Sequence, residues 1–310
     1  MPWCYNEIGI EKGMIFINRQ LKGSMYLVAC SFVWGMAFVA QGSAMDYVQP
    51  ATFVFARFTI TCVVLALAAP LFERLSGGRS DREPSMKRHL AVGGIIGVVL
   101  GVASYLQQLG LVHTSPTNSG FVTALYIVIV PLLGLFMGRR VTRMLWLGLA
   151  LSLTGMVLLC VQSDLSINLG DVFTLGSAFM FSLQILMVSR YAPNLDALKL
   201  SALQFAACAV ISGVAAVLFE TPRLEGALNC IGSILYVAVC SGAIGYTLQM
   251  VGQKYADPTL AAILMCLESV FAALGGWLLL GQALSPRELL GCALMLAASV
   301  IAQLPEKRAS

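Results

Sequence analysis

The chain has 310 residues, of which 58% are hydrophobic and only 11% are charged, and its formal net charge is +4. Soluble globular domains carry about a quarter charged residues, so this composition excludes an ordinary soluble domain. The nine cysteines are scattered without a Cys-x-x-Cys pair, which argues against a disulfide framework and a zinc site. No Walker-type phosphate-binding motif is present, so the chain is not expected to hydrolyse ATP.

Ten apolar runs fill the chain, and each is about 20 residues long, enough to cross a bilayer as a helix. They cover residues 24–42, 51–72, 89–110, 116–137, 142–162, 170–190, 199–219, 229–252, 258–280 and 286–304. We therefore predict an all-α polytopic membrane protein with ten transmembrane helices. Residues 1–23 form a polar N-terminal segment that lacks the pattern of a signal peptide, and residues 305–310 form a short tail.

Basic residues predict the orientation, because loops that face the cytoplasm are enriched in Lys and Arg. With the N-terminus in the cytoplasm, sixteen of the nineteen Lys and Arg residues fall in cytoplasmic segments. Only Arg223 and Arg287 fall in outer loops, and Arg57 lies within a span. We expect both termini and the loop at residues 73–88 to be cytoplasmic. The positive charge is then a signal of topology, and a nucleic-acid partner is not expected.

The first two spans each contain one side chain that could take part in a site. Trp34 in the first span either faces lipid or forms the wall of a cavity. Arg57 lies in the second span, where an arginine is rare and usually faces protein, water or a partner. Its place near the outer end of the span also allows it to snorkel to the surface. Arg57 is therefore a candidate for contact with a ligand or an acidic partner.

The third span combines a row of small residues with a polar end. Gly93, Gly97 and Gly101 recur every four residues and line one face of the helix, so another helix can approach closely there. The outer third of the same span holds Tyr105, Gln107 and Gln108.

The fourth and ninth spans contain the two most unusual residues for a membrane helix. Pro131 removes one backbone hydrogen bond and should kink the fourth span, so we predict a hinge there. Glu268 is the only acidic residue deep inside a span, close to its midpoint. A charged, unpaired carboxyl at this depth costs about several kcal/mol, so it should be protonated, paired or in water. It serves either proton coupling and solute contact or a structural role between helices.

The second half of the chain repeats the plan of the first half. One constant separation relates the pairs Gln107 and Gln249, Pro116 and Pro258, Thr117 and Thr259, and Leu125 and Leu267. Helix starts recur as well: Ser115, Thr142, Asp257 and Ser285 are placed as N-caps. Each half has five spans, an odd number, so the second copy must enter the membrane from the opposite side. We predict two inverted repeats, at residues 24–162 and 170–304, an architecture typical of secondary transporters.

Polar side chains that face the axis between the two halves are the candidate solute site. Besides Trp34 and Arg57, the candidates are Tyr105, Gln108, Asn118 and Tyr126 in the first half and Gln184, Tyr246, Gln249 and Glu268 in the second. Each of them could instead bridge neighbouring helices.

Four stretches carry a resemblance to a known family: Trp34-Gly35, Arg57-Phe58, the run from Leu125-Tyr126 to Pro131-Leu132-Leu133-Gly134, and Leu267-Glu268 to Gly281. As a set they resemble the EamA-type transporters of the drug/metabolite transporter superfamily, over nearly the whole chain. The resemblance implies ten helices in two EamA repeats, cytoplasmic termini, and transport of small metabolites such as amino acids, frequently outward. That family often has Leu-Glu-Pro in the ninth helix. Here Ser269 replaces the Pro, which leaves a kink there undecided.

We therefore expect a secondary transporter of small polar solutes, without a cofactor or a metal, in the plasma membrane (the inner membrane of a bacterium). Its expected partners are the solute, the lipid bilayer and a coupling proton, and either a monomer or a homodimer fits. A flippase for a lipid-linked precursor, whose cavity would open sideways to lipid, and a subunit of a membrane complex are the alternatives. No His-Glu-x-x-His motif, aspartate pair or Ser/His constellation supports an enzyme.

Overall fold

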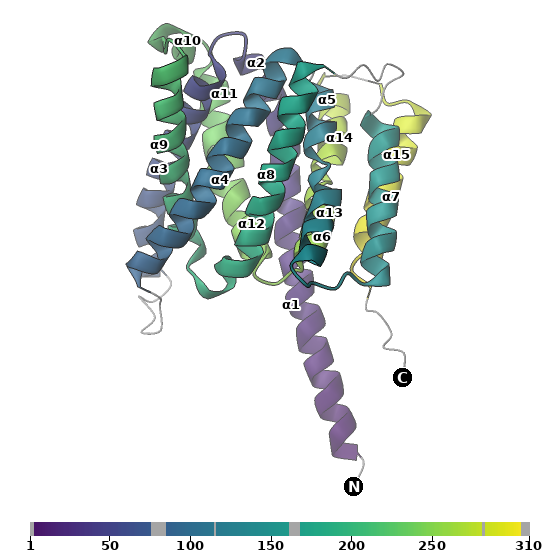
Figure 1. Ribbon diagram of the computed structural model, residues 1–310. Coiled ribbons are helices and arrows are strands. Elements are labelled where there is room, and N and C mark those ends of the chain that lie inside the picture. The colour runs from purple at the N-terminus through teal and green to yellow at the C-terminus, as the bar shows by residue number, and fades with distance from the viewer. Residues whose placement is uncertain (1–2, 76–84, 115, 161–167, 281–282, 305–310) are drawn as a thin grey trace.

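The structure is a computed structural model that describes residues 3–75, 85–114, 116–160, 168–280 and 283–304. Within these residues every element is a helix (Figure 1). The first half consists of α1 (Trp3–Gly35), α2 (Ala37–Ala44), α3 (Pro50–Leu75), α4 (Met86–His113), α5 (Pro116–Thr123), α6 (Tyr126–Phe136) and α7 (Arg143–Cys160). The second half consists of α8 (Leu169–Tyr191), η1 (Ala192–Asn194), α9 (Ala197–Phe219), α10 (Leu224–Asn229), α11 (Ile231–Tyr236), η2 (Val237–Gly245), α12 (Tyr246–Gly252), α13 (Pro258–Met265), α14 (Glu268–Leu280) and α15 (Pro286–Ile301).

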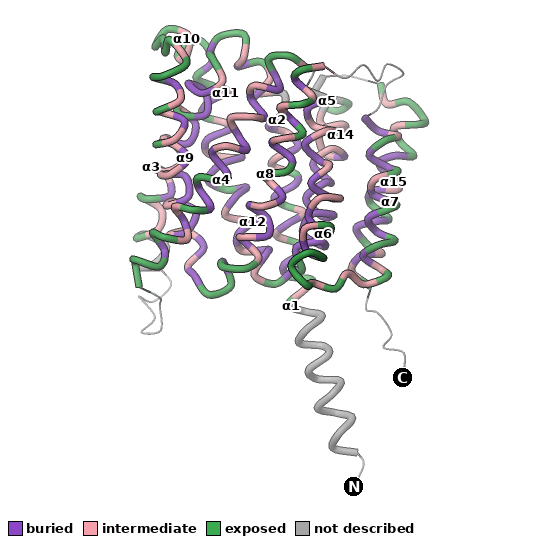
Figure 2. Tube along the Cα trace, in the orientation of Figure 1, coloured by how far each residue is buried: buried purple, intermediate pink, exposed green. Residues whose placement is uncertain are grey.

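The outer surface of the bundle is apolar, as lipid requires. Buried residues lie where helices meet, and exposed ones lie on the outward faces (Figure 2). Leu67, Phe136 and Val217 are 71%, 89% and 77% exposed, whereas soluble proteins rarely expose extended apolar surface. Eight helical segments in the described residues are long and apolar enough to cross a membrane. The chain is therefore a multi-pass membrane protein.

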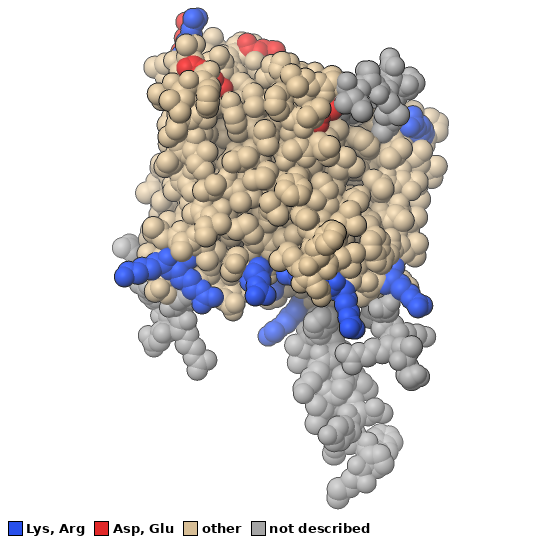
Figure 3. Space-filling model, in the orientation of Figure 1, with Lys and Arg blue, Asp and Glu red and all other residues tan. Residues whose placement is uncertain are grey.

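Charged residues divide between the two ends of the bundle (Figure 3). Lys and Arg gather at the end where α4 begins and α8 ends, with Arg88 in the first turns of α4 and Arg190 in the last turn of α8. We call this end the basic edge. Most Asp and Glu side chains in this view lie at the other end, the opposite edge, where α3 begins and α9 ends.

The second half of the chain is turned over relative to the first half. The helix α4 begins at the basic edge, whereas α12 ends there (Figure 1). These two helices carry the duplicated residues Gln107 and Gln249, so equivalent segments run in opposite directions.

Close contacts between helices recur at equivalent places in the two halves. A Cβ atom added to Gly23 in α1 would lie 2.9 Å from the carbonyl oxygen of Gly252 in α12. A Cβ atom added to Gly110 in α4 would lie 3.0 Å from the carbonyl oxygen of Gly170 in α8. Gly110 and Gly252 have the same separation in sequence as the two duplicated glutamines. The two halves therefore repeat both their sequence pattern and their packing.

The described N-caps explain where several helices begin. The caps predicted at Thr142, Asp257 and Ser285 are confirmed, since each side chain accepts a hydrogen bond from a backbone N–H in the first turn. Ser285 also forms a complete capping box with Glu288. Ser115 lies outside the described residues.

The fourth and ninth predicted spans are broken helices, and their breaks lie at equivalent positions. The fourth span divides into α5 and α6 at Ala124 and Leu125, and the ninth divides into α13 and α14 at Cys266 and Leu267. Pro131 lies inside α6, so the interruption comes before the residue where we predicted the hinge. A helix in a bundle tolerates an interior proline because neighbouring groups can satisfy the freed carbonyl. The second break forms without a proline, because Ser269 stands where the family often has one.

The polar N-terminal segment continues into the first span as one helix. Residues 3–23 are helical as part of α1, which projects beyond the bundle at the basic edge (Figure 1). Most of the predicted loop between the second and third spans, residues 76–84, lies outside the described residues.

The glycine row of α4 gives a matched test of helix packing. A Cβ atom on Gly97 would meet the backbone of Gln204 and approach the Cβ of Ala207 to 2.6 Å, whereas nothing lies within 4 Å of a Cβ on Gly94. We expect Gly97→Ala to lower the free energy of unfolding by about 1–3 kcal/mol, because α4 and α9 must separate. Gly94→Ala should be neutral or raise it by up to about 1 kcal/mol. Thermal unfolding in detergent measures both, and equal shifts would refute packing at Gly97.

Candidate functional site

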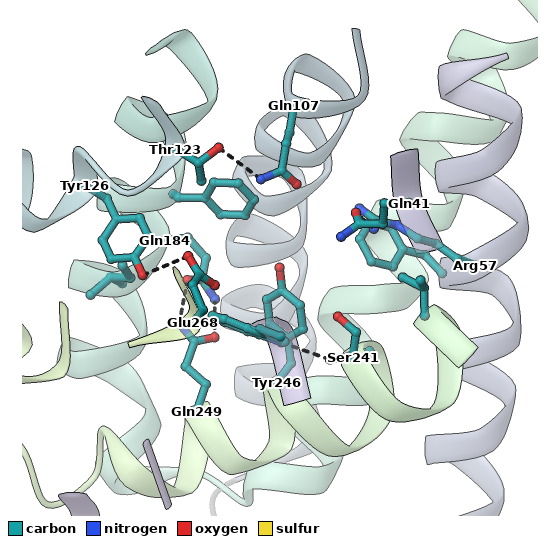
Figure 4. Close-up of a pocket in the computed structure, with 16 residues that line it drawn as sticks. Gln41, Arg57, Gln107, Thr123, Tyr126, Gln184, Ser241, Tyr246, Gln249 and Glu268 are labelled. Atoms are coloured by element: carbon teal, nitrogen blue, oxygen red, sulfur yellow. Dashed lines mark hydrogen bonds between the residues drawn. The ribbon is translucent and has the colours of Figure 1, made fainter. Parts of the chain in front are cut away.

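A polar cavity lies at the centre of the bundle, between the two halves (Figure 4). Its volume is about 50 Å³, and because a water molecule needs at least about 10–15 Å³ by this measure, it has room for a few waters. Its lining residues are Trp34, Gln41, Arg57, Phe58, Gln107, Thr123, Tyr126, Phe181, Gln184, Ile185, Val237, Ser241, Gly242, Tyr246, Gln249 and Glu268.

The two broken helices present a tyrosine and a carboxyl group to this cavity. Tyr126 is the first residue of α6 and Glu268 is the first residue of α14, so each follows an interruption. They occupy equivalent positions, 142 residues apart, and the Tyr126 hydroxyl donates to Oε1 of Glu268 at 3.3 Å. The thiol of Cys266 donates to the carbonyl oxygen of Ala124 across the same separation, at 3.5 Å. The two helix breaks are therefore bonded directly to each other.

Glu268 is almost fully enclosed, with 4% of its surface exposed. Among the described residues, the hydroxyl of Tyr126 donates a hydrogen bond to the Glu268 carboxyl group. A charged carboxyl in so enclosed a site still costs energy unless a cation or further donors accompany it. The site is therefore suited to hold a proton or an ammonium group at Glu268.

Arg57 lies on the other side of the cavity, with Tyr246 between it and Glu268 (Figure 4). It is 5% exposed, Nη1 donates to Oε1 of Gln41, and the guanidinium lies over the rings of Phe53 and Phe58, at 5.4 and 4.6 Å from their centroids. Among the described residues, Nε has no hydrogen-bond partner and no carboxylate balances the charge. Such a guanidinium has donors available for an anionic group.

Four polar side chains close the cavity in two pairs. Gln184 and Gln249 exchange two hydrogen bonds, Nε2 of Gln184 to Oε1 of Gln249 at 3.3 Å and the reverse at 3.1 Å. Gln107, the counterpart of Gln249, donates to Thr123 Oγ1 at 3.1 Å. The double amide pair joins α8 to α12 in the part of the cavity nearer the basic edge, and no such amide pair is described around Gln107.

An aromatic wall and a wide helical turn complete the site. The indole N–H of Trp34 donates to the carbonyl oxygen of Ser241 at 3.1 Å, and the Trp34 and Tyr246 rings lie 4.7 Å apart. Ser241 belongs to η2, a π-helix. Such segments are frequent at functional sites. The equivalent part of α4 is a regular helix, so the π-helix is one point where the two halves differ.

Comparison with known proteins shows the family of the chain. The EamA-like transporter family matches the chain twice, over residues 21–161 and 168–303. The chain belongs to this family. Uncharacterized transporters of Archaeoglobus fulgidus are among its relatives. One is 28% identical over 92% of this chain and 87% of its own length, and another is 26% identical over 82% and 87%. A protein with a solved crystal structure is 20% identical in sequence to this chain. The two structures match over 90% of this chain and 96% of the other chain with a TM-score of 0.72, so they share the fold.

The structure brings together seven of the ten candidate residues of this EamA transporter: Trp34, Arg57, Tyr126, Gln184, Tyr246, Gln249 and Glu268 line the cavity. Tyr105 and Gln108 do not line it; Tyr105 is half-buried, and Gln108 is buried with its amide donating to the sulfur of Met45 at 3.5 Å. The side chain of Asn118 lies outside the described part of the structure.

Sequence reasoning did not assign four polar lining residues to the site: Gln41, Gln107, Thr123 and Ser241. The duplication could have pointed to Gln107, because it is the exact sequence counterpart of Gln249. No comparable signal marks Gln41, Thr123 or Ser241.

The reciprocal amide pair gives a test of this geometry. Replacing Gln249 with Leu leaves the amide of Gln184 buried without its partner, so we expect a loss of about 1–3 kcal/mol in the free energy of unfolding. The double variant Gln184→Leu/Gln249→Leu should regain most of that loss, because no polar group of the pair remains unpaired. Thermal unfolding of both single variants and the double variant measures the coupling. Strictly additive losses would contradict a direct pair.

Proposed function

We propose that this chain is a secondary transporter that carries a small zwitterionic solute, of the amino-acid class, across the plasma membrane by alternating access. One observation carries the proposal. A buried guanidinium and a buried carboxyl face the same cavity from different sides without forming a pair with each other. A zwitterion complements such a site, with its carboxylate at Arg57 and its ammonium group at Glu268.

The size of the cavity supports a moving carrier rather than a fixed pore. With room for only a few waters, the cavity must widen to accept a solute of amino-acid size. The breaks before Tyr126 and Glu268 and the π-helix η2 interrupt regular hydrogen bonding beside the site, so the walls can move there at low cost. Inverted repeats with broken helices at a central site are typical of carriers that open to each side in turn.

We further propose that the basic edge faces the cytoplasm, as the distribution of Lys and Arg favours. The chain then crosses the membrane ten times, by the eight candidate segments together with α1 and α15. Export is the direction that the family resemblance favours. Glu268 is the proposed site of the coupling proton, which it exchanges with the ammonium group of the solute.

Competition among related solutes tests the substrate class. The purified protein in liposomes should take up radiolabelled α-amino acids from a panel of neutral side chains. The matching amine without a carboxylate and the matching acid without an ammonium group should compete at least about tenfold more weakly, because each loses one charge-assisted contact. Equal competition by uncharged sugars or alcohols, or no uptake of any zwitterion, would refute the proposed class.

A further inference from the structure

A buried glutamine in α9 has no apparent role in the described conformation. Gln204 is 0% exposed, and neither its Nε2 nor its Oε1 has a hydrogen-bond partner among the described residues. Burying an amide without partners is unfavourable, and native structures satisfy nearly all such groups. An apolar residue of similar size would fill the same space without this cost. We therefore expect a second conformation in which the amide of Gln204 forms hydrogen bonds.

The symmetry of the two halves identifies the counterpart of each residue in α9. Thr61 in α3 donates its hydroxyl to the carbonyl oxygen of Ala238 in η2, at 2.8 Å. Cys208 in α9 donates its thiol to the carbonyl oxygen of Gly97 in α4, at 3.1 Å. These bonds join the equivalent helix pairs, once in each half; the acceptors Gly97 and Ala238 are 141 residues apart, one fewer than Gln107 and Gln249, because the wider turns of the π-helix η2 hold one residue more. Thr61 and Cys208 are therefore equivalent positions in α3 and α9.

One turn before them, the same separation in sequence relates Phe58 to Phe205. Their rings contact each other with centroids 5.0 Å apart, as equivalent residues on a common axis can do. The residues directly before these two phenylalanines are Arg57 and Gln204, so they are counterparts as well. Arg57 lines the cavity, whereas Gln204 does not. The two halves thus place equivalent polar residues in different environments.

A second pair shows the same asymmetry. Ser104 in the first half is the counterpart of Tyr246 in the second half, because the same separation in sequence relates Gln107 to Gln249. Tyr246 lines the cavity, whereas Ser104 is 0% exposed and its hydroxyl has no partner among the described residues. By contrast, Gln107 and Gln249 both line the cavity. Gln204 and Ser104, two of the buried polar residues without partners, are thus counterparts of the lining residues Arg57 and Tyr246.

We propose that Gln204 and Ser104 form a second solute-binding surface, which lines the cavity when the protein opens to the basic edge. When the two halves exchange conformations, α9 takes the present position of α3, and Gln204 takes the role that Arg57 has now. This inference rests on the alternating access of the proposed function. The carboxylate of the solute is then held by a guanidinium on one side and by a neutral amide on the other. Since charge-assisted hydrogen bonds are roughly twice as strong as neutral ones, binding from the basic edge should be about tenfold weaker.

Thiol labelling tests the exposure of these positions without any solute. Arg57→Cys, Gln204→Cys and the control Ser212→Cys are made in a background whose own cysteines are replaced. Ser212 is buried in the same helix at 1% exposure and does not line the cavity. A membrane-impermeant maleimide is added to right-side-out and inside-out vesicles. Position 57 should react from the opposite edge, position 204 from the basic edge, and position 212 from neither.

Labelling of position 204 from neither side, or from the same side as position 57, would overturn the proposal. The result is separable from the test of the substrate class. Side-specific labelling without amino-acid uptake would refute the proposed solute but support this inference. Amino-acid uptake with an unreactive position 204 would support the proposed solute and overturn this inference.

A second measurement does not depend on the cysteine-replaced background. Gln204→Leu removes the unpartnered amide, so it should raise the unfolding temperature by at least about 2 °C. The same variant should lower the affinity for the best-transported amino acid of the panel at the basic edge, with the affinity at the opposite edge unchanged. A lower unfolding temperature with equal affinities on both sides would show that Gln204 is a satisfied structural residue, and would overturn the proposal.

Discussion

Glu268→Gln should abolish accumulation of the solute against its gradient and should remove the dependence of transport on pH. The variant keeps the shape of the side chain and its hydrogen bond with Tyr126, but it can neither bind and release a proton nor carry charge. If Glu268 couples transport to protons, exchange of labelled for unlabelled solute should persist while net uphill transport is lost. We would measure both in liposomes with and without an imposed pH gradient.

The alternatives for Glu268 give different results in the same assay. If the carboxyl serves only to hold the ammonium group, Glu268→Gln should lose binding of zwitterions at every pH, and exchange should fail as well. Unchanged, still pH-dependent transport would leave Glu268 only a structural role. The matched control is Glu225→Gln, because Glu225 is exposed in α10 and should have no effect.

Arg57→Met should reduce the affinity for solutes that carry a carboxylate by at least about 30-fold, since losing one partner of a buried charged contact costs about 2–5 kcal/mol. The variant should still fold, because Met fills much of the same volume beside Phe53 and Phe58 and no buried acid is left without its cation among the described residues. Amines without a carboxylate should bind it nearly as well as they bind the native protein. Competition against labelled amino acid measures these affinities.

Two further variants sharpen the assignment of Arg57. Arg57→Lys keeps the positive charge but loses the planar fork and its stacking on the rings, so it should restore part of the affinity. Arg223→Met changes an exposed arginine near the opposite edge and should leave affinity unchanged. If both Arg57 variants bound amino acids like the native protein, Arg57 would have no contact with the solute.

The sequence alone was sufficient for the class of protein and for the relation between its halves. Apolar runs of bilayer length can be satisfied only by membrane helices, and the caps at Asp257 and Ser285 marked helix starts correctly. The duplication of Gln107 and Gln249 pointed to two equivalent halves, and the family model matches the chain twice. These inferences depend on length, polarity and local chemistry, which are properties of a segment by itself.

Tertiary packing decided which polar residues meet. Successive residues of a helix point about 100° apart, so Gln107 faces the cavity while its neighbour Gln108 is buried elsewhere, against Met45. Tyr105 is close to the face of Gln108 and also lies off the cavity. Nothing in a helix that is apolar nearly all round reveals which face turns inward, because lipid and protein interior accept the same side chains.

Packing also decided where the helices break. The local rule predicted a hinge at Pro131, which lies inside α6 and stays a prediction. The described break lies at Ala124 and Leu125, opposite the equivalent break at Cys266 and Leu267. Sequence determined the multi-pass class, the caps at Thr142, Asp257 and Ser285 and the duplication, because each depends on the chemistry of a segment and its solvent. Only the tertiary structure placed Arg57 and Glu268 in one cavity and left Gln204 without a partner, because those facts depend on how distant segments fit against each other.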